Sequence, residues 1–393
     1  MTAPGLPRGL VPLLSAANFV IGMGAFLVIG ALGPLGRDLS MSPAQAGWVL
    51  TSYALGYALL SPLLVSLTGG LGRRRVLALG MGLFALAAMG SALAPSAGWL
   101  FAARVLAAAG AGMCTPVTAA VAGALAPPDR RAHVLAMTLF GLTLAQVLGV
   151  PAGSWIAYQA GWRAAFWVVA VLAVLATVAL WLRVPAGLSF QPVRLADLAR
   201  VLAAPRMMLA IGFTATFLGA IYVPYTYLAP LLEQAMGLGR DGVTAALAVY
   251  GAGAVVGNLL GGRLADRLGA VRTLVLLSLG QVALMPLIST LPWGLMPALA
   301  FFFLWAVSGW SFMAGQQARL VTLAGARAPV VLSLNAAAIY LGAAFGAALG
   351  GWVVSGAGLM AVGWAGGLLA LGAVAHILAS ARLAPVDSAP LRP

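Results

Sequence analysis

Apolar runs of about twenty or more residues alternate with short polar breaks along almost the whole chain. A helix needs about 20 apolar residues to cross the hydrocarbon core of a bilayer, so each run has the length of a membrane span. The pattern therefore predicts twelve spanning helices joined by short loops. The runs are 12–34, 44–67, 76–95, 98–125, 133–158, 164–184, 206–232, 243–262, 273–291, 294–316, 330–354 and 359–381.

The longest polar break divides six runs from six. It predicts an N-terminal six-helix bundle over 1–184, a linker over 185–205 and a C-terminal six-helix bundle over 206–393. The two halves also share an internal repeat at a constant offset of 197 residues. The scarcer matching residues are Tyr53 and Tyr250, Pro95 and Pro292, and Trp155 and Trp352. A repeated six-helix unit predicts two bundles related by a pseudo-twofold axis along the membrane normal.

Composition excludes an ordinary soluble protein. Apolar residues make up 63% of the chain, charged residues 7%, and the mean hydropathy is +1.05. The first apolar run is too long for the hydrophobic region of a secretory signal, so we interpret it as a span. A single cysteine, Cys114, excludes an internal disulfide, and the sequence offers no Cys/His pattern for a metal site. We expect no cofactor.

The net charge of +14 comes from 21 arginines against seven acids, and lysine is absent. If the N-terminus lies in the cytoplasm, only Arg37, Arg163 and Arg240 fall outside and Arg104 falls within a span. All the others, Arg319 among them, fall on the cytoplasmic side, as the positive-inside rule requires. We therefore predict a multi-pass protein of a bacterial inner membrane with both termini in the cytoplasm, and we expect no nucleic-acid partner.

Four stretches carry a family resemblance. They are "RVLAAAGAG" (104–112), "LGVPAGSWIAYQAGWRAAFW" (148–167), "YTYLAPLLEQAMG" (225–237) and "GRLADRLG" (262–269). In this order the chain resembles the major facilitator superfamily, and within it the twelve-span drug:proton antiporter group, near arabinose or sugar efflux proteins and phenicol exporters. The resemblance implies an all-α membrane protein with the major facilitator fold, and not an enzyme.

The resemblance also implies gating residues. Arg263, Asp266 and Arg267 would form a charge latch beside the membrane, with Asp266 favoured near a helix N-terminus. The upstream copy keeps Arg73, Arg74 and Arg75 but has Gly69 and Gly70 where the motif has an acid and an arginine. A simple topology anchor is the alternative. In span five, Gly149, Pro151 and Gly153 would form the smooth, bendable face that accompanies export, or serve ordinary close packing.

Arg104 would help to couple protons, unless it snorkels to the interface. The acid that this group carries in span one is replaced by Ala25. All seven acids fall in loops or at helix ends; they are Asp38, Asp129, Asp197, Glu233, Asp241, Asp266 and Asp387. Because Asp38 and Glu233 occupy nearly equivalent positions of the repeat, we hypothesise that they form an outer gate or peripheral proton site with Arg104. Solvated helix ends are the alternative.

Polar and aromatic residues of the cavity-lining spans are the candidate substrate contacts. They are Asn18, Tyr53, Tyr57, Thr115, Gln146, Tyr222, Tyr225, Tyr227, Tyr250, Trp305, Trp310, Gln316, Asn335 and Tyr340. Aromatic walls without a buried acid favour neutral or anionic amphipathic molecules. The leading interpretation is a proton-coupled multidrug or sugar-like efflux antiporter that works as a monomer in the bilayer. A proton-independent uptake or bidirectional facilitator is the alternative.

Overall fold

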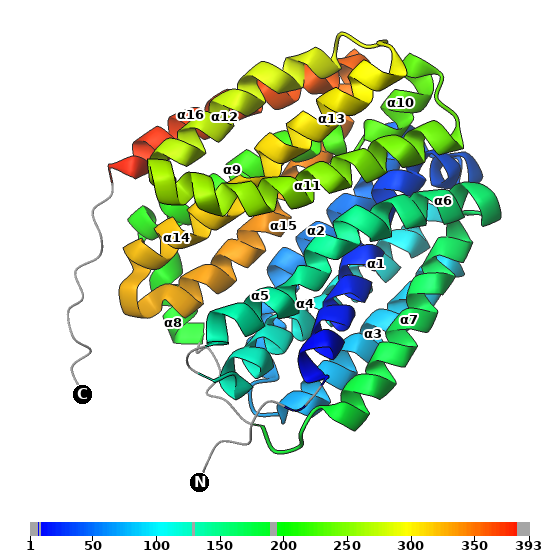
Figure 1. The fold of residues 1–393 in the computed structure, drawn as a ribbon. Coiled ribbons are helices and arrows are strands. Elements are labelled where there is room, and N and C mark those ends of the chain that lie inside the picture. The colour runs from blue at the N-terminus through cyan, green and yellow to red at the C-terminus, as the bar shows by residue number, and fades with distance from the viewer. Residues whose placement is uncertain (1–6, 8, 128–129, 189–194, 383–393) are drawn as a thin grey trace.

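The structure is a computed structural model that describes residue 7 and residues 9–127, 130–188 and 195–382. Within these ranges it contains twelve helical segments long and apolar enough to cross a membrane (Figure 1). The predicted twelve spans are confirmed, most of them to within a few residues at each end. Of the residues named above, Asp129 and Asp387 lie outside the described ranges.

The first half holds spans one to six, and its fifth span is interrupted. Its helices are α1 Leu10–Asp38, α2 Pro43–Leu67, α3 Arg73–Ala92, α4 Ala97–Leu125, α5 Arg131–Leu144, the π-helical turn Ala145–Gly149, α6 Val150–Ala160 and α7 Trp162–Arg183. Side-chain caps fix two of the starts. Ser42 and Gln45 form a reciprocal capping box before α2, and Ser96 accepts a hydrogen bond from the Trp99 amide before α4.

The second half holds spans seven to twelve, and spans seven and ten are each built from two helices. Its elements are α9 Pro205–Tyr225, α10 Leu228–Met236, α11 Arg240–Leu268, α12 Ala270–Ile288, α13 Leu295–Trp310, α14 Phe312–Ala324, the 3₁₀ turn Gly325–Arg327, α15 Ala328–Ala357, the 3₁₀ turn Leu359–Ala361 and α16 Val362–Ala381. A short helix, α8 Leu195–Leu202, precedes them inside the predicted linker.

The same helix neighbours recur in both halves. α1 packs on α5, α6 and α7 as α9 packs on α15 and α16, and α2 packs on α4 as α11 packs on α13. The halves contact each other through α2 with α15 and through α6 with α11. The internal repeat relates one of these two contacts to the other. Gly161 and Gly358, one repeat apart, turn the chain with nearly equal positive φ of 88° and 85°. The all-α fold of two pseudo-symmetric six-helix bundles is confirmed, while the boundaries at 184 and 206 remain predictions.

The two ends of the molecule differ in how the halves meet. We call the end where α1 begins and α16 ends the terminal end, and the end that carries α10 and the close of α6 the far end (Figure 1). One continuous core joins both halves through the middle and the far end. Near the terminal end the second half has a separate core, which includes Met207, Leu320 and Leu334. The halves are therefore packed together toward the far end.

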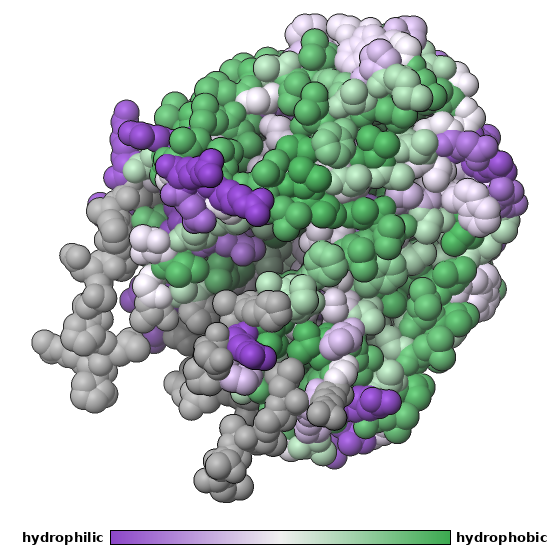
Figure 2. Space-filling view, in the orientation of Figure 1, coloured by the Kyte–Doolittle hydropathy of each residue, from purple (hydrophilic) through white to green (hydrophobic). Residues whose placement is uncertain are grey.

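Apolar side chains cover the outside of the helices. Figure 2 shows a broad hydrophobic band with hydrophilic residues gathered at the two ends. Trp352 and Leu182, for example, are 76% and 71% exposed on this surface. Exposure of so large an apolar surface to water would be unfavourable. This band is therefore the surface that faces lipid.

Two charged residues lie in other surroundings than the sequence predicts. Arg319 follows the predicted run 294–316, but α14 continues to Ala324 and includes it. It is buried, and its Nη2 donates to the Ser380 carbonyl oxygen at 2.7 Å and hydroxyl at 2.9 Å. It therefore binds the last turn of α16, whose carbonyls lack helical partners. Asp266 lies in the last turn of α11 rather than near a helix N-terminus, because α11 continues to Leu268. The helix dipole does not favour an acid there.

We predict that Gly110→Val in α4 destabilises the first half. A Cβ at Gly110 would lie 2.5 Å from the Gly80 carbonyl oxygen and 2.6 Å from the Phe84 amide nitrogen, so α3 would have to move. Overpacking of this kind costs about 1–3 kcal/mol. Thermal unfolding of the detergent-solubilised protein measures the loss. Gly98→Val is the control, because nothing lies within 4 Å of a Cβ there; equal melting temperatures for the two variants would contradict the prediction.

Candidate functional site

Aromatic side chains form a continuous cluster through the middle of the molecule. We call it the aromatic belt; its members are Phe26, Tyr53, Tyr57, Tyr222, Tyr225, Tyr250, Trp305 and Tyr340. All eight are buried. Every member except Phe26 is one of the predicted substrate contacts, so the fold brings half of that set into one place.

The belt crosses from one half to the other. The rings of Tyr57 on α2 and Tyr340 on α15 stack with their centroids 3.8 Å apart. Phe26 on α1 lies 6.4 Å from Tyr340 and 6.3 Å from Tyr222 on α9. Aromatic pairs at these separations attract one another beyond the area they bury. The belt is therefore a contact between the two halves.

Hydrogen-bonding atoms in and beside the belt are left without partners. The hydroxyls of Tyr53 and Tyr250, one repeat apart, are buried and make no hydrogen bond. The Trp310 Nε1 lies near the Tyr250 hydroxyl, yet neither completes a bond. Trp305, by contrast, donates to Gln281 Oε1 at 2.8 Å. Because unsatisfied buried polar groups cost free energy and are uncommon, these three atoms mark positions where a bound molecule could bind.

Arg104 lies beside the belt and is 1% exposed, so it does not snorkel to the interface. Its two Nη atoms donate to the carbonyl oxygens of Gly24 and Ala25 at 2.7 and 2.8 Å. Its guanidinium also stacks 4.5 Å from the Tyr53 ring centre. The resemblance predicts an acid at position 25. Here the Ala25 backbone carbonyl accepts the hydrogen bond from Arg104 instead. No carboxylate is among the partners of Arg104 in the described part of the chain.

Asn18 joins three helices of the first half. Its Nδ2 donates to Thr118 Oγ1 at 2.9 Å and to the Thr138 carbonyl oxygen at 3.0 Å, while its Oδ1 has no partner. The amide therefore ties α1 to α4 and α5. One acceptor oxygen remains for other contacts.

A matching group joins three helices of the second half. Gln316 Nε2 donates to the Ala210 carbonyl oxygen at 2.9 Å and to Thr214 Oγ1 at 3.0 Å, and Thr214 Oγ1 donates to Asn335 Oδ1 at 2.5 Å. Gln316 Oε1 has no partner. Asn335 stands one repeat after Thr138, so the two polar groups occupy equivalent places. In this structure the side-chain amides of Asn18 and Gln316 bind neighbouring helices to one another.

Among the remaining predicted contacts, Thr115 lies beside the hydroxyl of the belt residue Tyr57. Thr115 is buried in α4, and Gln146 is half-buried in the π-helical turn. Tyr227, at the break between α9 and α10, donates to the Ala347 carbonyl oxygen at 2.7 Å. A Cβ at Gly47 of the other half would strike its ring, so Tyr227 packs between the halves near the far end.

Span five contains a π-helical turn. Pro151 has no amide hydrogen to give the carbonyl four residues earlier, and the Val150 amide instead bonds the Ala145 carbonyl five residues back. Gly149 and Gly153 face α1, where their absent side chains make room for Met23 and Leu27. The glycine face therefore packs within the first half. The contact with α11 is made by Gly251 against the backbone of Val147.

Glu233 on α10 is bound by residues of the other half at the far end. One carboxylate oxygen accepts a hydrogen bond from the Tyr158 hydroxyl on α6. The other lies 3.5 Å from Nη1 of Arg37 at the end of α1. The Glu233 side chain is 20% exposed, whereas that of Arg37 is 64% exposed. This group of three residues is a charged contact across the interface.

Asp38 has partners only within its own half. Its Oδ2 accepts from Trp162 Nε1 at 3.0 Å and from Arg163, which also donates to the Ala94 carbonyl oxygen at 2.9 Å. Asp38 therefore fixes α1 against α7. The structure does not bring Asp38, Glu233 and Arg104 together, because Arg104 contacts mid-span residues and Asp38 and Glu233 have separate partners.

Arg73 and Arg74 contact the end of α7 and the residues that follow it. Arg74 stacks 4.2 Å from the Trp181 ring centre, and the Arg73 amide donates to the Leu188 carbonyl oxygen at 3.0 Å. Asp266 forms no ion pair with Arg263 or Arg267 in the described part of the chain. The predicted latch contact is therefore not formed in this conformation.

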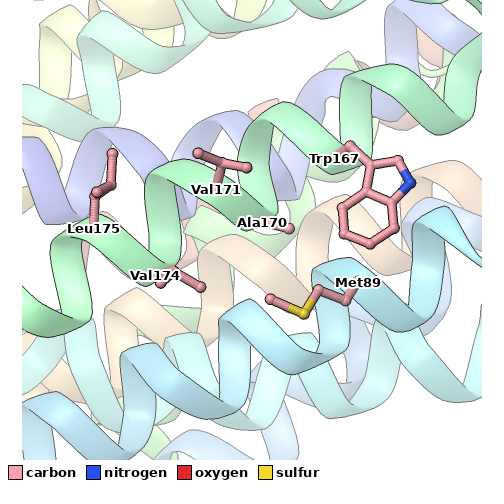
Figure 3. Close-up of a pocket in the computed structure, with 6 residues that line it drawn as sticks. All are labelled: Met89, Trp167, Ala170, Val171, Val174 and Leu175. Carbon is pink, nitrogen blue, oxygen red and sulfur yellow. The ribbon is translucent and has the colours of Figure 1, made fainter.

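Two hollows lie away from the belt. An apolar groove of about 280 Å³ lies between α3 and α7. Figure 3 shows Met89 on one wall and Trp167, Val171, Val174 and Leu175 on the other. Its residues belong to the lipid-facing surface. A second hollow of about 510 Å³ lies at the far end beside Arg37, Asp38 and Arg163. Neither coincides with the predicted substrate contacts.

Two alike helical bundles that meet at a buried aromatic cluster have the architecture of a polytopic membrane transporter. Residues 14–330 match the family description "Major Facilitator Superfamily". The chain therefore belongs to this superfamily of transporters, which are not enzymes.

Known relatives agree with this assignment. The inner membrane transport protein YdhP of Escherichia coli (strain K12) is 32% identical over 95% of this chain and 97% of its own. A chloramphenicol resistance protein of Streptomyces lividans is 34% identical over 65% of this chain and 66% of its own. A bacterial homologue of the human lysosomal transporter Spinster, in an inward-facing and unoccupied conformation, has a TM-score of 0.75 at 19% identity and covers 96% of this chain and 98% of its own. This last likeness shows the fold alone.

Sequence reasoning missed Phe26, Arg37 and Tyr158 as functional candidates. Phe26 follows Ala25 directly, and Tyr158 lies inside the span-five stretch that carries the family resemblance. Each is marked only by a partner from the other half, and neither composition nor spacing identifies that partner.

We predict that Arg104→Met leaves the protein folded, with a change in unfolding free energy of less than about 1 kcal/mol. The substitution removes a buried charge and leaves no unpaired acid, and the Gly24 and Ala25 carbonyls lie within the α1 ladder. Arg104→Glu, which points a carboxylate at the same carbonyls, should prevent folding. Size-exclusion profiles and melting curves of both variants provide the measurement. Equal damage from both would mean that the arginine–carbonyl bonds are needed for the fold.

Proposed function

We propose that this protein is a secondary active exporter of small amphipathic molecules in a bacterial inner membrane. The observation that carries the proposal is the aromatic belt, which is contributed by both halves and lies between a packed far end and a divided terminal end. Rocking of the halves about this belt would expose it first to one side and then to the other.

Orientation and direction follow from the charge pattern. The positive-inside rule favours a cytoplasmic terminal end, with Arg73, Arg74, Arg75, Arg263 and Arg267 on that side. The conformation described here would then be closed toward the outside. In this state an exporter would take up its substrate from the cytoplasm.

The unpaired groups around the belt favour one chemistry. Trp310 Nε1 and Arg104 Nε can only donate hydrogen bonds, and the hydroxyls of Tyr53 and Tyr250 can donate as well. Such a set is complementary to aromatic molecules that carry carbonyl, nitro or carboxylate acceptors. Since no described carboxylate lies near the belt to balance a cation, we favour neutral or anionic substrates. The chloramphenicol resistance protein among the relatives is consistent with a drug of this kind.

Proton antiport is the coupling mode we propose, with a proton-independent facilitator as the second candidate. The absence of an acid at Ala25, where Arg104 binds the backbone instead, favours the second candidate. We expect the protein to act as a monomer.

We expect a pH gradient to drive export. Chloramphenicol uptake into inside-out proteoliposomes should rise several-fold when the lumen is made acidic, because protons leaving the lumen would drive exchange. Ethidium, a cation, is the comparison compound and should not be carried. Uptake that is equal with and without the gradient would favour the facilitator. Absence of protein-dependent flux for both compounds and for a panel of sugars would contradict the substrate class.

Tyr250→Phe should raise the KM for chloramphenicol about 3- to 10-fold, the loss expected for one neutral hydrogen bond. Its ring would still stack on Tyr225, 4.4 Å away between centroids, so folding should be unchanged. Tyr227→Phe is the matched control, since that hydroxyl already bonds the Ala347 carbonyl. If the two variants have the same KM as the parent protein, the Tyr250 hydroxyl does not contact substrate.

A further inference from the structure

We propose that the outer face of α3 and α7 holds one anionic phospholipid of the leaflet at the terminal end. Arg74 binds the lipid phosphate, and an acyl chain lies in the apolar groove between the two helices. This site is separate from the aromatic belt, and it depends neither on the substrate of the transporter nor on the direction of transport.

Arg74 lies at the edge of the lipid-facing surface. It belongs to the first turn of α3 at the terminal end, and its guanidinium stacks 4.2 Å from the ring centre of Trp181 in the last turn of α7. Trp181 is 44% exposed, and tryptophan rings favour the depth of the lipid headgroups. The stacking therefore holds a positive charge at the level of the lipid phosphates.

The guanidinium of Arg74 is able to bind a phosphate. Its Nε has no hydrogen-bond partner, and no described acid forms an ion pair with it. An arginine stacked on an aromatic ring still presents a planar fork of donors that matches phosphate oxygens. The neighbouring Arg75 and Arg183 are exposed and add positive charge. An anionic phosphatidylglycerol suits this site better than phosphatidylethanolamine, whose ammonium group would meet arginines.

The apolar surface of α7 leads from this pair into the groove. Trp181, Val178, Val174, Val171 and Trp167 follow one another at intervals of three and four residues, which places them on one face of the helix. Each of them is more than one-third exposed. The groove is thus the continuation, deeper in the membrane, of the surface on which Arg74 stacks.

Small residues on α3 form the opposite side. Ala78 and Gly82 follow Arg74 at intervals of four, and a Cβ at Gly82 would lie 3.8 Å from Thr177 of α7. This face of α3 therefore lies along α7 and carries little side-chain volume. Met89 lies at the deeper end of the groove, opposite the α7 side chains (Figure 3).

The distances along α7 suit an acyl chain of one leaflet. Val174 and Val171 lie seven and ten residues from Trp181. At the rise of an α-helix these separations are about 10 and 15 Å. One leaflet contributes about 15 Å to the hydrocarbon core of a bilayer. A lipid whose phosphate binds Arg74 therefore has the lower part of its chain beside the groove.

The second half lacks the polar part of this site. One repeat after Arg74 and Trp181 stand Val271 and Leu378, on α12 and α16. These two helices pack together as α3 and α7 do. Packing of the helix pair therefore does not require an arginine stacked on a tryptophan, and the second half supplies matched positions for control variants.

Native mass spectrometry of the full-length protein in detergent tests the proposal. Phosphatidylglycerol or phosphatidylethanolamine is titrated at a few lipids per protein, and the Kd of each bound lipid is measured. We expect the first phosphatidylglycerol to bind several-fold more tightly than the later ones and than phosphatidylethanolamine. Glycerol 3-phosphate, which lacks the chains, should not displace it. If all the lipids bind with equal Kd, only non-specific lipid surrounds the protein and the proposal is overturned.

Two variants test the phosphate contact. Arg74→Gln should raise the Kd of the first phosphatidylglycerol about fivefold, the contribution of one arginine beside a lipid surface. Trp181→Leu, which introduces the residue of the second half, should raise it about two- to fivefold through loss of the stacking. Arg272→Gln is the control, because it removes an exposed arginine at the same end and should leave this Kd unchanged. Equal effects of Arg74→Gln and Arg272→Gln would show that only the overall charge attracts the lipid.

A third variant tests the acyl-chain contact. Val171→Trp fills the groove and should raise the Kd of the first phosphatidylglycerol several-fold while leaving Arg74 in place. Leu368→Trp on α16 is its control: it lies one repeat later, is 69% exposed, and should leave the Kd unchanged. Melting curves without added lipid should be alike for both variants, since both positions are on the surface. If Val171→Trp binds the lipid as Leu368→Trp does, no chain occupies the groove and the proposal is wrong.

Discussion

Direct contact of helix backbones at glycine is the constraint on which the structure depends. In lipid no hydrophobic effect drives helices together, so dispersion between closely approaching backbones has to do so. Gly253 and Gly257 of α11 lie against the Phe303 and Val307 carbonyls of α13, and a Cβ at either would come within 2.5 Å of those oxygens. Gly342 lies in the same way against Ala215 of α9. Helices in such direct contact cannot move apart gradually, so each half behaves as one rigid unit.

The interface between the halves is built differently. It relies on ring contacts such as Tyr57 with Tyr340, and on the hydrogen bonds of Glu233. Close backbone approaches across the interface occur at Gly251 against Val147, beside the π-helical turn, and at Gly351, where a Cβ would lie 3.3 Å from the Ala44 carbonyl oxygen. Side-chain contacts can break and re-form without disturbing a helix, whereas the glycine contacts cannot. The contacts within each half thus make it a rigid body, whereas the contacts between the halves allow the interface to move. Rigid-body switching requires this combination.

The sequence was sufficient to predict whatever depends on hydropathy and repetition. The twelve spans follow from run length, and the equivalence of Tyr53 with Tyr250 follows from the repeat offset. The burial of Arg319 was not predicted, because it lies beyond the end of an apolar run, where an arginine is expected to be exposed; its aliphatic stem and the Ser380 carbonyl allow it to be buried. The π-helical turn before Pro151 was not predicted either, since proline indicates a lost hydrogen bond but not how the helix rewinds. Partners across the interface, such as Tyr158 for Glu233, depend on three-dimensional packing that no local pattern encodes.

The repeat also shows why the far end need not behave symmetrically. A pseudo-twofold axis along the membrane normal maps the far end onto itself, so a charged contact there could have occurred twice. The position equivalent to Glu233 is Gly36, and the position equivalent to Tyr158 is Ser355. Neither can supply the carboxylate or the long phenolic donor. Asp38, two residues from Gly36, has Trp162 and Arg163 as its partners instead and stabilises one half. Duplication fixed where the halves meet, and divergence left Glu233 as the acid that, within the described residues, is bound across the interface.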